Sequence, residues 1–317
     1  MRKEDTKMQK KPLIVIAGPT ACGKTSLSIE LAKQLKTEII SADSMQIYKY
    51  MDIGTAKPAV EEMQGIHHHL IDELEPDEKY SVAIFQRMAK ERMDSIYKKG
   101  KIPIVVGGTG FYINALLHDN DFSEIDANAE SDGYRQQLTD LLHEKGADFL
   151  HEMLQNIDPE SAQKIDKNNS KRVMRALEYH QQTGKKISDH NAHEKQKACC
   201  YNATIAVLHT DRKVLYDRIN TRVDVMLQRG LVQEVKDLLD KGYKQDLISM
   251  QGLGYKELSL YLDGTCTLED AIETLKRDTR RFAKRQLTWF RHQTDGIWFD
   301  IGTETVQQIC EKIKNEV

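Results

Sequence analysis

Gly18-Pro19-Thr20-Ala21-Cys22-Gly23-Lys24-Thr25 is the stretch that decides the fold of this chain. It matches the pattern G-x-x-x-x-G-K-[ST], in which a glycine-rich loop surrounds phosphate groups. An apolar run at residues 13–17 precedes it, as expected of a buried parallel strand. Residues 26–36 follow with leucines four positions apart, which predicts an amphipathic helix. Strand, loop and helix together predict a P-loop for a polyphosphate, bound by backbone N–H groups, Lys24 and Mg2+ on Thr25.

The composition is typical of a soluble protein and sets the compartment. The chain has 317 residues, of which 30% are charged, enough for one large or two ordinary domains. It has no run of 18 apolar residues, and residues 1–11 lack the apolar stretch of a signal peptide, so we expect no membrane segment. The five cysteines form no C-x-x-C pair, which favours a reducing cytoplasm over a disulfide scaffold or zinc finger.

Apolar runs and helical patterns alternate along the first part of the chain. We expect further strands at residues 38–42, 67–72 and 102–106, and a helix at residues 80–99 before Gly100. This βαβ order predicts the α/β class: a P-loop NTPase-like parallel sheet with helices on both faces.

The pattern changes at about residue 119, because no convincing strand follows until residue 201. Helices are expected at residues 134–145, 148–155 and 170–183, and residues 185–197 are polar and typical of a loop. Strand character returns at residues 201–209 and again at 296–300. The simplest organisation is a discontinuous P-loop core at residues 1–119 and 201–317, with an all-helical domain inserted at 120–200.

Polar residues follow two of the expected strands, at the edge where open parallel sheets bind their ligands. Asp43 follows the second strand and is either a general base or metal partner, or a cap for a following helix. Thr109 lies between glycines after the fourth strand, where it either contacts a ligand or simply turns the chain into a helix.

Two other candidates have ordinary explanations. Strand alternation would place His67 and His69 on one face and His68 on the other. Because no carboxylate or cysteine spacing completes a metal site, we interpret these histidines as structural or as part of a substrate edge. Arg222 could clamp a phosphate, but alone it would be an ordinary surface arginine.

Residues 276–291 form a strongly basic helical pattern, with seven basic residues and one acidic residue. Opposite charges are nearly absent, so this stripe differs from an ordinary solvated helix face and suits a nucleic-acid backbone. A second, smaller basic cluster occupies residues 170–175.

A set of motifs in a fixed order spans nearly the whole chain. They are GPTACGKT at 18–25, SADSMQIY at 41–48, IGTAKP at 53–58, HHLID at 68–72, GGTGFY at 107–112, RALE at 175–178 and RFAKRQLTWFR at 281–291. With this set the chain resembles the tRNA dimethylallyltransferases. Many NTPases share the first motif, whereas the combination is specific to this family.

The resemblance implies transfer of a dimethylallyl group from dimethylallyl diphosphate to N6 of adenosine 37, beside the anticodon of tRNA. The P-loop would then hold the diphosphate leaving group with Mg2+. Asp43 matches the family's general base, and Thr109 and Arg222 match residues that contact the diphosphate or the reacting centre.

The resemblance also implies the partners, namely the tRNA anticodon stem-loop and dimethylallyl diphosphate. We further expect a cytoplasmic protein that binds no membrane and acts as a monomer. The residues expected along the tRNA are Asp43, Ser44, Met45, Gln46, Thr109, Arg135, Lys171, Arg172, Arg175, Gln251, Gly252, Lys256, Arg280, Arg281, Lys284, Arg285 and Gln286.

Other functions remain open from the residues alone. A P-loop kinase of a small metabolite or nucleotide would fit residues 18–25 and Asp43 equally well, but it does not need the basic helix at 276–291. An RNA-binding protein without chemistry would leave Asp43 and Thr109 unexplained.

Overall fold

The computed structural model describes residues 10–122 and 131–317. Its sheet has six parallel strands in the order β3-β2-β4-β1-β5-β6. The strands are β1 Pro12–Ala17, β2 Ile39–Ser41, β3 His68–His69, β4 Ile104–Gly107, β5 Asn202–His209 and β6 Ile297–Asp300. This confirms the predicted parallel α/β sheet, although β2 and β3 are shorter than the expected segments.

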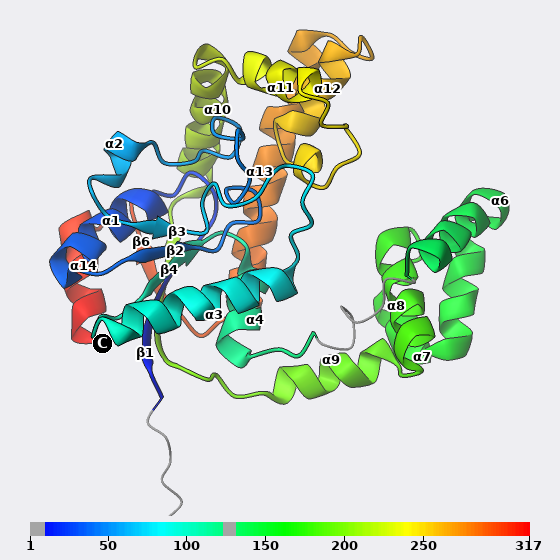
Figure 1. Cartoon of the computed structure of the whole chain (residues 1–317), viewed down its shortest axis with the longest axis horizontal. Coiled ribbons are helices and arrows are strands. Elements are labelled where there is room, and N and C mark those ends of the chain that lie inside the picture. Colours follow the sequence, from blue (N-terminus) through cyan, green and yellow to red (C-terminus); the bar gives the residue numbers. More distant parts are fainter. Residues whose placement is uncertain (1–9, 123–130) are drawn as a thin grey trace, which may run out of the picture. The chain divides into compact units, whose positions relative to one another are not determined.

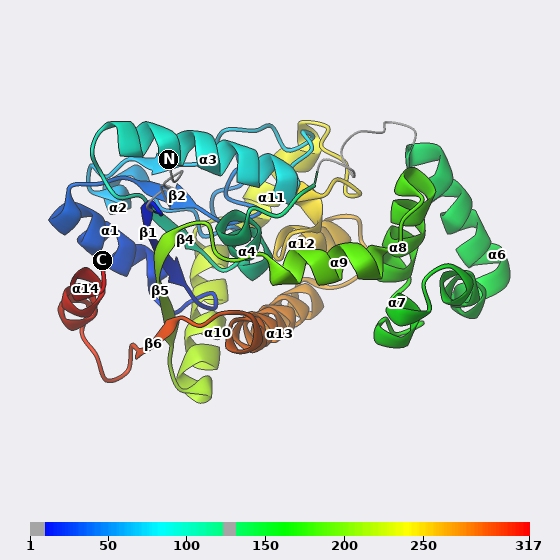
Figure 2. The same ribbon diagram turned by 90° about the horizontal axis from the view of Figure 1, so that it is seen from below.

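Helices cover both faces of the sheet. In the sheet unit they are α1 Lys24–Leu35, α2 Val60–Met63, α3 Val82–Lys98, α4 Gly110–His118, α10 Arg212–Gln228, α11 Leu231–Asp240, α12 Tyr255–Leu262, α13 Leu268–Gln293 and α14 Val306–Asn315, with a short 3-10 turn at Ser249–Gln251. Helices α1 and α14 lie together on one side of the sheet, and α4 lies on the other (Figures 1 and 2). Helix α3 packs against α4 through the stacked rings of Phe85 and Tyr112.

The core follows from the apolar runs of the central strands. Ile14 and Ile16 on β1 point to the face covered by α1 and α14, where Leu31 and Ile313 join the same buried cluster. Val15 points to the opposite face and is also fully buried. A central strand buried on both faces needs a continuous apolar run, which explains why residues 13–17 were recognisable in the sequence.

The chain divides into two compact units, residues 1–117 with 200–317 and residues 118–199. The second unit contains α6 Ser131–Ile157, α7 Pro159–Lys164, α8 Ser170–Thr183 and α9 Ile187–Gln196, and no strand in its described part. It has its own apolar core, which includes Leu138, Leu154 and Leu177. The sequence placed the corresponding borders at 119/120 and 200/201.

One prediction in this unit is wrong. Residues 185–197 were expected to be loop-like, yet most of them form α9. The polar composition misled because polar side chains are buried here: Ser188 donates its backbone N–H to Asp158, and Glu194 pairs with Lys197 at 2.8 Å. The two helices predicted on either side of Gly146 are one element broken at that glycine, where φ is 82°.

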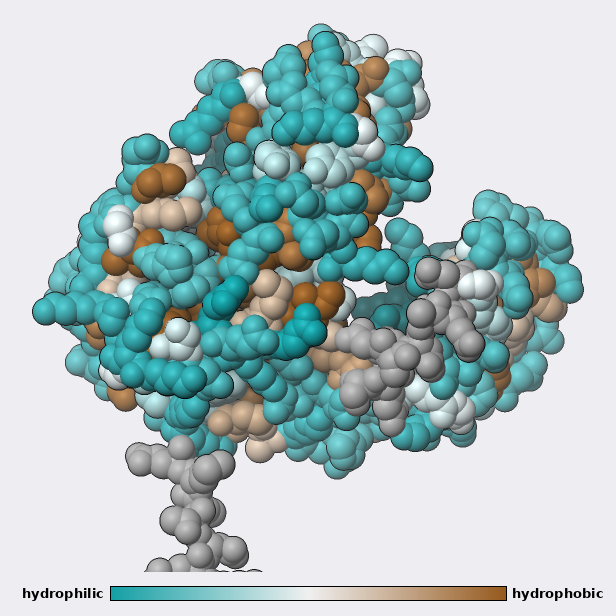
Figure 3. All heavy atoms as spheres, in the orientation of Figure 1, coloured by the Kyte–Doolittle hydropathy of each residue, from teal (hydrophilic) through white to brown (hydrophobic). Residues whose placement is uncertain are grey.

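The surface agrees with the composition. Hydrophilic residues predominate on the face shown in Figure 3, with small apolar areas among them. Across residues 10–122 and 131–317, no helix combines the length and the apolar character needed to cross a membrane.

Candidate active site

A cavity of about 150 Å³ opens at the carboxyl ends of the central strands. This is the position at which open parallel sheets bind ligands. The P-loop, the segment after β2, the end of β4 and helix α10 all contribute to its walls. The polar side chains in the lining include Lys24, Thr25, Asp43, Gln46 and Arg222. The tertiary structure therefore brings together three of the regions selected from the sequence.

The P-loop backbone has a conformation that glycine permits. Gly18 has a φ of 142°, and a Cβ atom there would lie 2.6 Å from the carbonyl oxygen of Leu208. Gly23 has a φ of 80° and forms the N-cap of α1. Helix α1 therefore begins at Lys24, two residues earlier than predicted, and its first N–H groups face the loop. Such a helix N-terminus is a ready site for an oxyanion.

Two cations lie at this loop. The Nζ atom of Lys24 donates a hydrogen bond to the carbonyl oxygen of Pro19 at 2.7 Å. The Nη1 atom of Arg222 reaches the hydroxyl of Thr20 at 3.4 Å. Burial lowers the pKa of the Arg222 guanidinium, with Cys22 and Glu62 acting in the opposite direction, yet an arginine stays charged in such a setting. Both cations suit a bound phosphate.

Asp43 is held by the turn that it begins. Its Oδ1 accepts the backbone N–H of Met45 at 2.9 Å and of Gln46 at 3.4 Å. No helix follows directly, so the alternative of a helix cap is wrong, although Asp43 does cap this turn. Desolvation raises the pKa of the Asp43 carboxyl, and the Met45 N–H, Lys24 and the Gln46 N–H oppose that rise. A carboxylate with a raised pKa is better suited to accept a proton.

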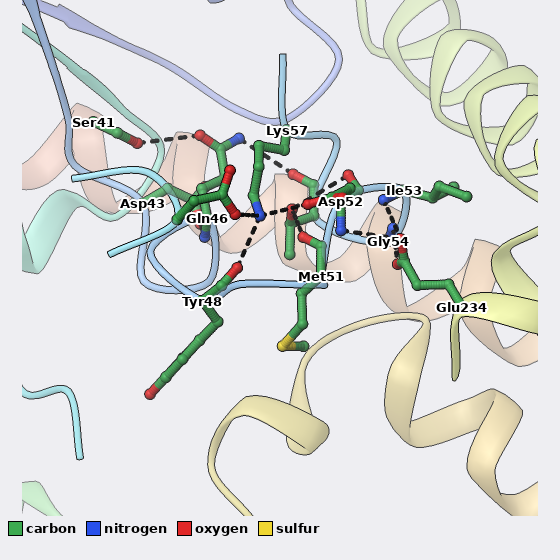
Figure 4. A network of polar contacts seen from close by, with 12 residues as sticks. Ser41, Asp43, Gln46, Tyr48, Met51, Asp52, Ile53, Gly54, Lys57 and Glu234 are labelled. Carbon is green, nitrogen blue, oxygen red and sulfur yellow. Dashed lines mark hydrogen bonds and ion pairs between the residues drawn. The ribbon is translucent and has the colours of Figure 1, made fainter. Parts of the chain in front are cut away.

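Gln46 lies beside Asp43 in a network that crosses the site (Figure 4). Its Oε1 accepts the hydroxyl of Ser41 at 3.1 Å, and its Nε2 donates to the carbonyl oxygens of Thr55 at 3.2 Å and Ala56 at 3.4 Å. Both ends of the amide are therefore oriented by the protein. A side chain held in this way is preorganised beside the carboxylate.

Gln286 has a task that the sequence did not reveal. It is 7% exposed, accepts the backbone N–H of Thr20 at 3.0 Å and donates to the carbonyl oxygen of Gly108 at 3.0 Å. It thus joins helix α13 to the P-loop and to the end of β4. Both ends of this buried amide are thus bonded within the protein, and the predicted contact of Gln286 with RNA stays a prediction.

Thr109 lies one residue before α4, and its carbonyl oxygen accepts the N–H groups of Tyr112 and Ile113. From this segment Gly107 lines the cavity, whereas Thr109 is not among the described residues that line it. Its catalytic role therefore stays a prediction.

A second cavity of about 480 Å³ shares Thr25, Ala56, Pro58 and Arg222 with the first. The two cavities meet at the P-loop, so a ligand bound by its phosphates at α1 would have space on that side.

Comparisons with known proteins agree with this site. Residues 46–293 match the family model described as IPP transferase. The chain belongs to the IPP transferase family. Among the curated members, the tRNA dimethylallyltransferase of Clostridioides difficile is 53% identical over 98% of this chain and 97% of the relative. The one of Lachnoclostridium phytofermentans is 51% identical over 95% and 98% of the two chains.

Solved structures extend the comparison to the fold of the IPP transferase family. A tRNA isopentenylpyrophosphate transferase from Bacillus halodurans is 45% identical, covers 97% of both chains and superposes with a TM-score of 0.72. A eukaryotic dimethylallyltransferase, described as acting on tRNA, is 33% identical with a TM-score of 0.75, over 92% of this chain and 74% of that one.

The predicted RNA-binding residues of this family member fall in both units. On α8, Lys171, Arg172 and Arg175 are exposed and lie on one helix. Arg135 is half-exposed and pairs with both carboxylate oxygens of Glu178 at 3.1 Å. The contact of these four basic residues with RNA stays a prediction.

In the sheet unit, two predicted segments are neighbours. A Cβ atom on Gly252 would lie 2.5 Å from Cε of Met45, so the backbone at Gly252 packs directly on the segment that carries Asp43. Gln251 and Lys256 flank this contact and are exposed. The structure therefore joins residues 43–46 and 251–256 into one surface beside the cavity.

Helix α13 has two different faces. Ala283, Gln286 and Phe290 are buried, whereas Lys284 and Arg285 are exposed. Asp278 pairs with Arg281 at 3.2 Å, and Arg280 donates to Asn220 on α10 at 2.6 Å. Within the part of the chain that the structure describes, neither Lys284 nor Arg285 has an ion-pair partner. Unneutralised cations on an exposed helix face favour binding of a polyanion.

His67 and His69 have a neighbour, Glu38, that their spacing did not predict. Potential ligand atoms of Glu38, His67 and His69 lie within 4.8 Å of one another. Glu38 also accepts Lys99 at 2.7 Å and His69 at 2.9 Å, and these bonds lower its pKa to about 2 although burial opposes the shift. Because Lys99 already neutralises this carboxylate, we interpret the group as an ion-pair network that joins β2 to β3.

Proposed function

We propose that this protein transfers a dimethylallyl group from dimethylallyl diphosphate to N6 of adenosine 37 in tRNA, releasing diphosphate. The observation that carries the proposal is the position of Asp43. Its carboxylate lines the same cavity as the P-loop and Arg222, in a chain of the IPP transferase family. The curated relatives are named for this reaction.

Asp43 is assigned to the proton transfer. The exocyclic amine of adenine is a weak nucleophile because its lone pair is delocalised into the ring. As the new N–C bond forms, the amine loses a proton, which Asp43 can accept. The two backbone N–H groups on Oδ1 fix the carboxylate, and no described residue hydrogen-bonds Oδ2. That oxygen is therefore the one assigned to the proton.

The P-loop is assigned to the leaving group. As the allylic C–O bond breaks, the diphosphate gains negative charge, and the N-terminus of α1, Lys24 and Arg222 face this position. Fixed donors and cations of this kind stabilise charge that develops in a transition state. The basic P-loop thus serves departure of a diphosphate and does not require ATP.

Mg2+ is the proposed cofactor. The Thr25 hydroxyl and the Asp43 carboxylate both line the cavity and are oxygen donors of the kind that Mg2+ prefers. The residues present therefore fit the ion, with Thr25 as the proposed ligand. Bound there, Mg2+ would neutralise charge on the diphosphate.

The remaining assignments concern partners and compartment. The exposed cations of α13 and α8 are proposed to bind the backbone of the tRNA anticodon stem-loop, and adenosine 37 must leave its stack to reach Asp43. Within the described residues, Cys22, Cys266 and Cys310 form no disulfide, which supports a reducing cytoplasm. We also propose that the protein acts as a monomer.

The test is transfer by Asp43→Asn. The protein is incubated with Mg2+, dimethylallyl diphosphate and unmodified tRNA, and the nucleosides are weighed by mass spectrometry. Loss of a general base should slow the transfer by about 10²–10⁴-fold while tRNA binding stays nearly intact. Asp237→Asn, on an exposed position of α11, is the matched control and should behave like the wild type.

Two outcomes would overturn the proposal. Normal turnover by Asp43→Asn, or equal loss of turnover and tRNA binding, would remove Asp43 from the role of base. Phosphate transfer from ATP to a small molecule in a parallel incubation, without modification of tRNA, would establish the kinase alternative.

A further inference from the structure

Glu234 lies in the first turn of α11, away from the P-loop, and a loop of the site is folded around it (Figure 4). Its Oε2 accepts the backbone N–H of Asp52 at 3.0 Å and of Ile53 at 2.7 Å. Its Oε1 accepts the N–H of Gly54 at 3.1 Å and the hydroxyl of Tyr255 at 2.6 Å. Four donors therefore converge on one carboxylate.

Residues 52–54 belong to no helix or strand, so hydrogen bonds of regular secondary structure do not hold them. The bonds to Glu234 hold them instead. Bonds to an ionised acceptor are stronger than bonds between neutral groups, so this carboxylate can fix an irregular backbone. The backbone also packs on a ring, because a Cβ atom on Gly54 would lie 2.5 Å from Tyr255. The four hydrogen bonds to Glu234 and the packing on Tyr255 leave the loop little freedom.

The loop leads directly to the reacting groups. Thr55 and Ala56 follow Gly54, and their carbonyl oxygens hold Nε2 of Gln46. The backbone N–H of Gln46 in turn reaches Oδ1 of Asp43 at 3.4 Å. Hydrogen bonds and the chain itself therefore connect Glu234 on α11 to the carboxylate of Asp43, by way of residues 54–56 and Gln46.

A second anchor, Lys57, holds the end of the same loop. Lys57 is almost fully buried, donates to the carbonyl oxygen of Tyr48 at 2.8 Å and pairs with Asp52 at 2.6 Å and with Asp72. Lys57 fixes the end of the loop and Glu234 fixes its middle. The carbonyls of Thr55 and Ala56 lie between the two anchors.

We propose that Glu234 is a positioning residue for the transfer reaction. It holds residues 52–54, and through them it keeps the Gln46 side chain in a fixed orientation beside Asp43, where the acceptor amine of the adenine has to be placed. The expected effect of Glu234 on kcat rests on the proposed function. The holding of the loop by Glu234 is independent of any substrate.

The experiment compares Glu234→Gln with Glu257→Gln in the full chain. Glutamine at position 234 keeps the size of the side chain, but it replaces one carboxylate oxygen with an NH2 group. That group is a donor and would face the backbone N–H groups and the Tyr255 hydroxyl, which are donors themselves. Glu257 is the matched control, because it is 5% exposed and its Oε2 accepts one N–H, that of Gly254 at 2.8 Å, outside the loop. Amide hydrogen exchange of residues 52–57, kcat and the tRNA Kd are measured for both.

We expect faster exchange of residues 52–57 in Glu234→Gln only, with kcat reduced by about 10–100-fold, as for other losses of indirect positioning. The tRNA Kd should change less than about threefold, because no RNA-facing cation is removed. Tyr255→Phe removes one of the four donors and should give a smaller loss in kcat, which provides a second variant if Glu234→Gln folds poorly.

Unchanged exchange in Glu234→Gln, or faster exchange with unchanged kcat, would overturn the inference. So would an equal loss of kcat in Glu257→Gln, since a general loss of stability would then explain both. Absence of transfer by the wild type would refute the proposed function instead, and the exchange experiment would still decide whether Glu234 holds the loop.

Discussion

Replacing Gln286 with glutamate should make the stability of this protein depend on pH, because the change exchanges one donor for an acceptor at constant size. Nε2 of Gln286 donates to the carbonyl oxygen of Gly108 at 3.0 Å, and Oε1 accepts the N–H of Thr20 at 3.0 Å. An ionised glutamate keeps the second bond and turns the first into a contact between two acceptors. A protonated glutamate can make both bonds.

The magnitude follows from these contacts. Leaving a buried carbonyl oxygen without its donor costs about 1–3 kcal/mol. Burial and the nearby carbonyl therefore raise the pKa of the new carboxyl above its ordinary range in the folded state. The direction of the change in the free energy of unfolding follows from this raised pKa. The variant matches the wild type at low pH and loses stability as the pH rises through the folded-state pKa. A loss of about 2 kcal/mol corresponds to a Tm lower by about 4–8 °C for a domain of this size.

The assay is thermal unfolding of Gln286→Glu and wild type at about pH 5 and about pH 8, within the range where the carboxyl titrates. The matched control is Gln293→Glu, at the exposed end of the same helix, where the added charge meets solvent. The Tm difference from the wild type should be small at the lower pH and large at the higher one. A Tm loss that is equal at both values, or no loss at the higher pH, would refute the assigned contacts.

The remaining predictions use the same site. Because desolvation raises the pKa of Asp43, ionising it costs stability, so Asp43→Asn should have a higher Tm than the wild type, by an amount that grows with pH. For the same reason the wild-type transfer rate should rise with pH, with an apparent pKa above the ordinary range of an aspartate. An apparent pKa within the ordinary range would contradict the burial of Asp43. Arg281→Ala with Lys284→Ala should weaken tRNA binding and reduce the slope of log K against log salt by about one to two, whereas an unchanged slope would place the RNA elsewhere. Gly110→Ala should lower stability by about 1–3 kcal/mol in denaturant unfolding, because its Cβ would lie 2.1 Å from Trp289, and a neutral effect would contradict that packing.

Helix α9 and Gln286 show why part of the structure could not be predicted from the sequence. The sequence of α9 is polar, and other segments satisfy its buried polar residues. Asp158 accepts the backbone N–H of Ser188, and Glu194 accepts the backbone N–H of Asp121. Gln286 lies in a basic helix next to exposed cations, so its type and neighbours indicated RNA. Only the packing of α13 turns this one side chain inward to the P-loop.

The network around Glu234 has the same origin. Its residues come from segments about 180 positions apart, and the separations of Asp52, Ile53 and Gly54 from Glu234 are 182, 181 and 180. No local pattern marks a glutamate in the first turn of a helix as the support of a distant loop. The Glu38–His67–His69 group was missed for the same reason, since Glu38 directly precedes the neighbouring strand β2 and lies about 30 positions from the histidines.

The sequence by itself determined the parallel sheet, the P-loop and the identity of Asp43 as the candidate base, because each depends on residues within a few positions. Apolar runs buried on both faces, glycines with positive φ and polar residues at strand ends are local consequences of backbone and solvent physics. The tertiary structure alone decided which cation meets the P-loop and how the loop at residues 52–54 is supported from α11. Gln286, Arg222 and Glu234 act through contacts between segments far apart in the chain, and such contacts exist only once the sheet and its helices have packed.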